Sequence, residues 1–178
     1  MRIVETALNG VFSIEASPHR DARGVFARYY CPEEFHKAGI AFTSTQINLS
    51  GNPRKHTLRG LHYQPEPFAE AKLVRAVRGR AFDVVVDIRA GSATRGQWIS
   101  VELSADAMNA VFVPEGCAHG FLTLEDDTDI LYQMGRPFEP GHAAGYRWND
   151  PTFAIDWPAE PAVIGDADQC WPEFSVAG

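Results

Sequence analysis

An arginine, a histidine and a lysine lie close together in a stretch of strand-like sequence. Arg59 and His62 belong to the segment T-L-R-G-L-H-Y-Q at 57–64, and Lys72 follows shortly after it. Burying several such nitrogen-bearing groups is costly unless an anion meets them, so the cluster predicts an anionic ligand. Histidine is also the side chain best suited to moving a proton near neutral pH. The stretch therefore indicates proton transfer on an anionic substrate, next to a carbonyl group that acidifies the carbon.

Strand geometry leaves the orientation of two of these residues open. Strict alternation along a strand places Arg59 and His62 on opposite faces. Both line one pocket only if Gly60 marks a β-bulge or if the arginine reaches in from the start of the strand.

Three later residues could complete an acid–base site. His119 lies in C-A-H-G-F-L, Tyr132 in D-I-L-Y-Q, and Asp168 in G-D-A-D-Q-C-W-P. A tyrosine can exchange a proton across a pocket when a cation stabilises its anion, and a carboxylate commonly orients a histidine. Each also has an ordinary structural explanation: a histidine bonded to backbone, a packed strand tyrosine and a turn aspartate.

Metal binding is the natural rival for histidines in a β-barrel. The usual metal-holding barrel carries an H-x-H pair, but His62 is followed two positions later by Gln64. Four other histidines fall in loop-like or helix-like sequence: His19, His36, His56 and His142. Too few imidazole or thiolate ligands converge, so we expect no metal. Phosphate-loop and dinucleotide fingerprints and a nucleophile elbow are absent from the sequence, and we expect no cofactor.

The residues above must be positioned by β-strands, because the hydrophobic pattern has a period of two almost throughout. Turn signals separate roughly ten short strands, which is typical of a sandwich, jelly roll or barrel. The one expected helix is 32–38, with Pro32 in its first turn and Gly39 after its end. The expected strands are 11–16, 24–29, 45–49, 57–63, 72–77, 81–88, 98–103, 110–113, 120–124 and 129–133.

The bulk composition limits the function classes. The chain has 178 residues, 45% hydrophobic and 22% charged, which suits a single domain over 1–178 with a core that needs no disulfides. Its net charge of −7 argues against nucleic-acid or membrane partners. Three dispersed cysteines and the lack of a signal-like start favour the cytoplasm. From about 151 to 178 we expect an irregular C-terminal segment that wraps the domain.

An ordered set of motifs resembles the dTDP-4-dehydrorhamnose 3,5-epimerase family over nearly the whole chain. The matching segments are D-A-R-G-V-F at 21–26, Q-I-N-L-S at 46–50, T-L-R-G-L-H-Y-Q at 57–64, A-K-L-V-R at 71–75, F-D-V-V-V-D-I-R at 82–89, V-P-E-G-C-A-H-G-F at 113–121, L-Y-Q at 131–133, W-N-D-P at 148–151 and I-D-W-P at 155–158. The resemblance implies an all-β, cupin-type jelly roll that works as a homodimer without metal or organic cofactor. It also implies a nucleotide-diphosphate sugar as substrate.

The resemblance assigns a role to each candidate residue. His62 matches the catalytic base, Asp168 its partner carboxylate and Tyr132 the proton donor. Lys72 is the candidate to stabilise an enolate oxygen. Substrate-binding positions of the family match Arg23, Gln46, Asn48, Arg59 and His119, and Phe138 matches the residue that stacks on thymine.

Three departures from the family pattern concern the nucleotide end and the outcome of the reaction. Phe138 stands where tyrosine is common, the segment 133–137 differs, and Arg28 and Ala143 replace glutamates. The nucleoside (dTDP, CDP or GDP) and the inverted centre (C3, C5 or both) therefore stay open. The further alternatives are a non-catalytic sugar-binding jelly roll and a metal-dependent oxygenase or isomerase barrel.

Overall fold

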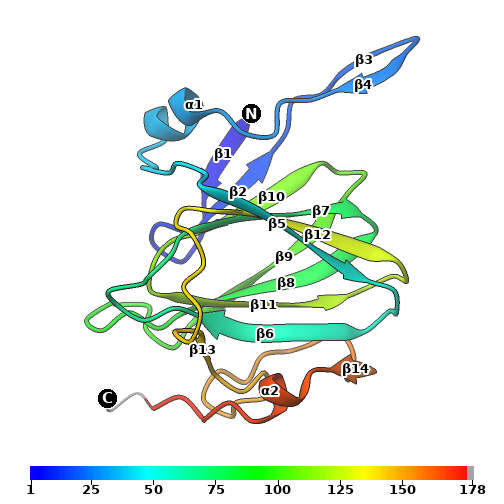
Figure 1. Ribbon diagram of the computed structural model, residues 1–178. Coiled ribbons are helices and arrows are strands. Elements are labelled where there is room, and N and C mark those ends of the chain that lie inside the picture. Colours follow the sequence, from blue (N-terminus) through cyan, green and yellow to red (C-terminus); the bar gives the residue numbers. More distant parts are fainter. Residues whose placement is uncertain (176–178) are drawn as a thin grey trace.

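Two antiparallel β-sheets face each other in the computed structural model, which describes residues 1–175 (Figure 1). One six-stranded sheet, called sheet A here, runs in the order β1 (Arg2–Glu5), β2 (Phe12–Glu15), β10 (Asn109–Val113), β7 (Lys72–Arg78), β12 (Thr128–Met134) and β5 (Gln46–Asn52). The facing sheet B runs β13 (Ala144–Gly145), β6 (Thr57–Tyr63), β11 (Cys117–Thr123), β8 (Arg80–Asp87) and β9 (Trp98–Ser104), with β14 (Val163–Ile164) parallel to β6. This arrangement is the expected all-β jelly roll.

The main core lies between the two sheets. Inward-facing residues of sheet A such as Val74, Val111 and Ile130 pack against Val85 and Phe121 of sheet B, and all five are at most 1% exposed. The residues alternate along each strand, so every second side chain enters this core. The core rigidly holds two sheets whose remaining inward-facing residues can form a site.

The chain termini cover the outer faces of the two sheets. Helix α1 (Pro32–Lys37) buries Phe35 against Leu73 and Phe112 on the outside of sheet A. On the outside of sheet B, the irregular segment after residue 150 places Phe153 and Phe174 against Val84 and neighbouring residues. This segment contains the short helix α2 (Asp166–Gln169). Residues 176–178 lie outside the described residues, and a single domain over 1–178 with a C-terminal wrap stays a prediction.

The hairpin of β3 (His19–Asp21) and β4 (Gly24–Phe26) projects away from both sheets (Figure 1). The sequence predicted one strand over 24–29, but β4 ends at Phe26. Most other predicted strands agree with the observed ones within a few residues. The two-residue strands β13 and β14, and β1 and β3, were not predicted from the sequence pattern because short edge strands carry little periodicity.

Candidate active site

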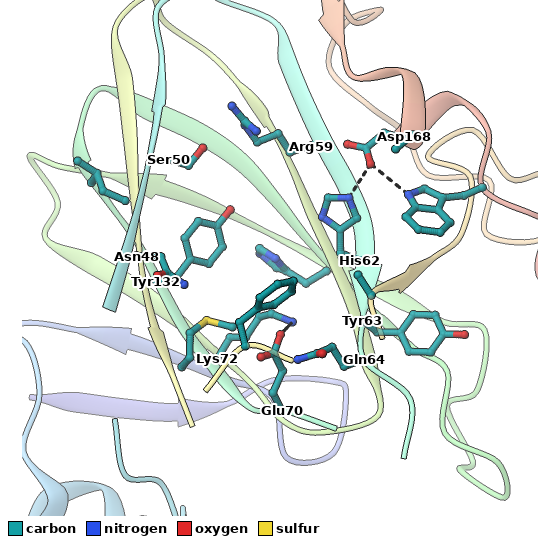
Figure 2. Close-up of a pocket in the computed structure, with 17 residues that line it drawn as sticks. Asn48, Ser50, Arg59, His62, Tyr63, Gln64, Glu70, Lys72, Tyr132 and Asp168 are labelled. Atoms are coloured by element: carbon teal, nitrogen blue, oxygen red, sulfur yellow. Dashed lines mark hydrogen bonds and ion pairs between the residues drawn. The ribbon is translucent and has the colours of Figure 1, made fainter. Parts of the chain in front are cut away.

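A cavity of about 340 Å³ opens between sheets A and B at one end of the barrel (Figure 2). Its walls come from β5, β6, β7, β11 and β12 and from α2, so residues far apart in sequence meet in it. The lining residues that carry polar groups are Asn48, Ser50, Arg59, His62, Tyr63, Gln64, Glu70, Lys72, His119, Tyr132, Asp168 and Trp171. The cavity therefore brings together eight of the ten predicted site residues, seven of them polar or charged and the eighth Phe138 at its rim.

His62 and Asp168 form a hydrogen-bonded pair in this cavity. His62 Nε2 lies 2.6 Å from Asp168 Oδ1, and the same oxygen accepts a hydrogen bond from Trp171 Nε1 at 3.1 Å. Partial burial by itself raises the pKa of Asp168, but the bonds from His62, the Gly60 amide and Trp171 outweigh it, so the pKa lies below its ordinary value. The carboxylate is thus ionised at neutral pH and holds the Nε2 proton, which leaves Nδ1 of His62 as the nitrogen with a free lone pair.

A bulge at Gly60 turns both Arg59 and His62 into the cavity. Between β6 and β11, His62 pairs with His119 while Arg59 pairs with Phe121, so β6 carries one extra residue. Gly60 has φ of +129°, and Leu61 packs instead into the outer cluster of sheet B. Of the two possibilities that the sequence left open, the bulge is confirmed.

We expect Gly60→Ala to destabilise the protein by about 3 kcal/mol, from backbone strain and overpacking together. A Cβ at position 60 would lie 2.6 Å from Gly120 Cα and 2.9 Å from the His119 carbonyl oxygen, which are backbone atoms that cannot move aside cheaply. Urea unfolding measures the difference. Gly165→Ala is the matched control, because a Cβ there meets nothing within 4 Å; equal stability of the two variants would contradict the bulge as the structure has it.

Tyr132 faces His62 from the opposite sheet. It extends from β12, and Figure 2 shows its ring across the cavity from the imidazole. Burial, and then the negative charge of Asp83, raises the pKa of the Tyr132 phenol well above its ordinary value, and Arg59 offsets only part of this rise. The phenol is therefore protonated at neutral pH and can act as an acid.

A second histidine–aspartate pair supports the cavity floor. His119 Nε2 lies 2.8 Å from Asp83 Oδ2, and both side chains are almost completely buried. Burial raises the pKa of Asp83, and the charge and hydrogen bond of His119 oppose that rise. The His119 ring meets Tyr132 edge-on at 6.0 Å between ring centroids, so the pair fixes one side of the phenol.

Two cations reach the cavity from different strands. The Lys72 ammonium is nearly buried and lies 2.8 Å from Glu70 Oε1. Arg59 donates from Nε to Asn52 Oδ1 at 2.9 Å, which leaves its terminal guanidinium nitrogens directed to the more open part of the site. The cavity thus offers a shielded cation at one end and a more exposed cation at the other.

Three predicted binding residues are placed differently from the rest. Phe138 is 49% exposed at the rim, and its backbone amide donates to Gln46 Oε1. Gln46 does not line the cavity; its amide donates to Asn48, which does. Arg23 lies on the β3–β4 hairpin, paired with Asp21 and away from the cavity of its own chain. A direct role of Gln46 and Arg23 in binding stays a prediction.

Several residues of the site were not predicted from the sequence. Trp171 was not singled out, although it follows Asp168 by three residues. It lies just past the end of α2, where its ring nitrogen reaches the Asp168 carboxylate. Asp83 was read only as part of an alternating strand, yet an aspartate between Phe82 and Val84 in a largely apolar strand signals a specific partner. Gln64 and Glu70 carried no pattern of their own.

Within residues 1–175, no group of three histidine, cysteine, aspartate or glutamate side chains is arranged to hold a metal ion. The expected absence of a metal stays a prediction. In the same part of the chain, no helix is long and apolar enough to cross a membrane.

A jelly-roll barrel that sets a histidine–aspartate pair opposite a protonated tyrosine, with a buried lysine beside them, defines an acid–base enzyme of the cupin type. Comparison with known proteins specifies the family. Residues 5–175 match the family model described as dTDP-4-dehydrorhamnose 3,5-epimerase, and the chain belongs to this family. The protein is therefore an isomerase, and the alternative of a non-catalytic sugar-binding jelly roll is disfavoured.

Individual relatives agree with this assignment. A dTDP-4-dehydrorhamnose 3,5-epimerase from Sinorhizobium fredii is 42% identical over 155 residues, covering 86% of this chain and 80% of the relative. The crystal structure of the Bacillus anthracis enzyme with TDP and pyrophosphate bound superposes with a TM-score of 0.94 at 34% identity, covering 97% of this chain and 99% of that one. A 3′-monoepimerase from Streptomyces bikiniensis in complex with dTDP-quinovose has a TM-score of 0.88 at 33% identity, covering 94% and 85%.

Proposed function

We propose that the protein epimerises a dTDP-linked 4-keto-6-deoxyhexose at both C3 and C5. The observation that carries this proposal is the placement of His62 with Asp168 on one side of the cavity and Tyr132 on the other. Inversion at a carbon needs a base on one face of the sugar ring and an acid on the other. The relatives named as 3,5-epimerases support the choice of substrate.

Proton abstraction is the task of His62. A hydrogen on C3 or C5 is acidified by the neighbouring C4 ketone, because the electron pair of the broken C–H bond moves onto the ketone oxygen. Nδ1 of His62 accepts the proton, and the ionised Asp168 stabilises the imidazolium that results. The enolate oxygen then needs a donor, and the Lys72 ammonium supplies it.

Reprotonation from the opposite face completes the inversion. The Tyr132 hydroxyl gives its proton to the carbon while the enolate electrons reform the C–H bond and the ketone. The tyrosinate regains a proton from solvent, and His62 releases its proton to solvent. Because the sugar could present C3 and C5 in turn, the same base and acid serve both centres.

The nucleotide end of the substrate belongs at the open end of the cavity. The exposed guanidinium of Arg59 suits the diphosphate. Phe138 lies toward the Lys72 end instead, because its amide is bonded to Gln46, which pairs with Met134 beside Lys72. Stacking of Phe138 on the base therefore stays a prediction. The TDP and pyrophosphate bound to the Bacillus anthracis relative support a dTDP-sugar over a CDP- or GDP-sugar.

A single-centre epimerase is the second candidate. The similarity to the Streptomyces bikiniensis 3′-monoepimerase favours it. The departures in the segment 133–138 also favour it, because Met134 and Phe138 of that segment line the cavity. In that case only one carbon exchanges its hydrogen.

Incubation with dTDP-4-keto-6-deoxyglucose in deuterated water tests both candidates. Proton NMR should show loss of the C3 and C5 hydrogens for a double epimerase, or loss at one carbon for the restricted enzyme. Exchange at neither carbon contradicts the proposed substrate. A parallel sample freed of metals with EDTA should exchange at the same rate, and restoration of lost activity by added metal would contradict metal-independent catalysis.

We also propose that two copies form a homodimer through sheet A. Ile47 and Leu49 on β5 are each 61% exposed, and Val77 on β7 is 39% exposed. Arg75 on the same outer face is 2% exposed, donates to the Tyr29 carbonyl and stacks on its ring, and has no carboxylate partner within residues 1–175. Burial lowers the pKa of Arg75 to about 10. An exposed apolar face beside an uncompensated cation favours a partner surface.

We expect sedimentation at twice the 19.7 kDa chain mass. Ile47→Arg should shift the protein toward the monomer, because it places a charge on the proposed contact face. Ala107→Arg, in an exposed turn, should leave the assembly unchanged. A wild-type monomer at micromolar concentration would refute the dimer.

The three cysteines are unpaired, which supports the proposal that the protein works in the reducing cytoplasm.

A further inference from the structure

The shielded end of the cavity contains an amide and a carboxylate that the proposed mechanism leaves unused. Gln64 and Glu70 line the cavity beside Lys72, and Figure 2 shows the three side chains at the end away from Arg59 and Asp168. Gln64 is 4% exposed and Glu70 is 8% exposed. Gln64 directly follows β6, and Glu70 lies two residues before β7. Both strands are held by the core.

Three buried polar atoms of this pair have no hydrogen-bond partner among the described residues. They are both polar atoms of the Gln64 amide, Nε2 and Oε1, and Glu70 Oε2. The other carboxylate oxygen of Glu70 is occupied by Lys72 at 2.8 Å. Buried polar groups in folded proteins are almost always paired, so unpaired atoms at a cavity wall indicate a ligand group.

The unpaired atoms define the chemistry of that group. Gln64 Nε2 can only donate, whereas Gln64 Oε1 and Glu70 Oε2 can only accept once the carboxyl is ionised. A hydroxyl group accepts a hydrogen bond from Gln64 Nε2 and donates its one proton to one of the two oxygens, so it pairs two of the three atoms. A methyl group pairs none of them and would leave all three atoms buried and unpaired.

We propose that Gln64 and the free oxygen of Glu70 bind the C3 hydroxyl of the hexose and so determine which edge of the sugar enters the cavity. This inference rests on the proposed function. Lys72 contacts the C4 ketone oxygen, and Glu70 is bonded to Lys72, so the group beside Glu70 belongs to a carbon next to C4. Of the two neighbours, C3 carries a hydroxyl, whereas C5 carries a methyl group and the ring oxygen, neither of which can donate a hydrogen bond to the unpaired oxygens. The hydroxyl side therefore faces Gln64 and Glu70.

The proposal makes Gln64 and Glu70 specificity-determining residues. A hydroxyl at C3 pairs two of the three unpaired atoms, whereas a 3-deoxy sugar pairs none of them. Sites built to bind a hydroxyl reject the analogue that lacks it strongly, by factors of about 10² or more. The C5 hydrogen is present in both sugars, so exchange at C5 reports on both.

The test compares deuterium exchange at C5 for three dTDP-4-keto-sugars: the parent 6-deoxyhexose, its 3-deoxy analogue and its 2-deoxy analogue. We expect wild-type kcat/KM to fall about 10²-fold for the 3-deoxy sugar and much less for the 2-deoxy sugar. In Gln64→Met, which keeps the side-chain length and removes both polar atoms, the penalty for the 3-deoxy sugar should shrink at least tenfold. Gln133→Met replaces a buried glutamine on β12 that does not line the cavity, and it should keep the full penalty.

The outcomes separate the inference from the proposed function. No C5 exchange of the parent sugar by the wild-type protein refutes the function itself. Normal exchange of the parent sugar with an equal rate for the 3-deoxy sugar refutes only the C3 contact. An unchanged 3-deoxy penalty in Gln64→Met refutes it too, and a dominant 2-deoxy penalty assigns the contact to the C2 hydroxyl instead. A variant that merely packs poorly would slow all three sugars alike, which also counts against the inference.

Discussion

Replacing His62 with alanine is expected to abolish deuterium incorporation at both carbons that flank the ketone. His62 lies in the cavity with its imidazole hydrogen-bonded to the ionised carboxylate of Asp168. A positioned general base contributes about 10²–10⁴ in rate, and without proton removal neither inversion nor exchange can begin. The measurement is NMR of the nucleotide sugar in deuterated water. Exchange at C3 and C5 should fall together.

Two companion variants sharpen this result. Asp168→Asn keeps the shape of the pair but no longer stabilises the imidazolium, so we expect a loss of about 10²–10⁴ in kcat. His36→Ala removes an exposed histidine of α1 and should change nothing. Near-normal exchange in His62→Ala would remove His62 from the mechanism, and exchange that persists at one carbon alone would show that a second base serves that centre.

The sequence predicted the residues of the candidate catalytic site but not the backbone geometry that brings them together. His62, Tyr132 and Asp168 were identified from residue type and motif. Whether Arg59 could join His62 depended on the pairing of β6 with β11, which brings Gly60 against Gly120. Register between strands that are distant in sequence is a property of the whole sheet, so local alternation could only leave two possibilities.

Pairs that meet only in three dimensions were beyond the sequence pattern. Asp83 and His119 are 36 residues apart and come from adjacent strands. Gln64 and Glu70 become conspicuous only because each has buried polar atoms with no hydrogen-bond partner among the described residues, and burial cannot be read from their spacing. Arg23 shows the opposite case: its motif predicted a binding role, yet the hairpin carries it away from the cavity of its own chain. A binding role for Arg23 therefore requires that its hairpin reach the cavity of the other copy in the proposed dimer.

Tyr132→Phe is expected to separate proton exchange from inversion. Removing the hydroxyl leaves His62, Asp168 and Lys72 in place, so the enolate can still form and be reprotonated from the His62 face. Because burial keeps the phenol protonated, it is the acid that the wild-type protein has ready on the other face. We therefore expect deuterium incorporation to continue with retained configuration while epimerised product falls about 10²–10³-fold.

The matched control is Tyr63→Phe. Tyr63 also lines the cavity, but its ring stacks on Tyr146 and its hydroxyl contacts the Tyr146 hydroxyl, which places its polar end outside the path of the proton. This variant should invert substrate at nearly the wild-type rate. Equal loss of exchange and inversion in Tyr132→Phe would mean that the phenol stabilises the enolate rather than delivering the proton, because only a group needed for enolate formation slows both. Unchanged inversion would require another donor on that face, and the buried His119, which meets the Tyr132 ring edge-on, would then be the residue to replace next.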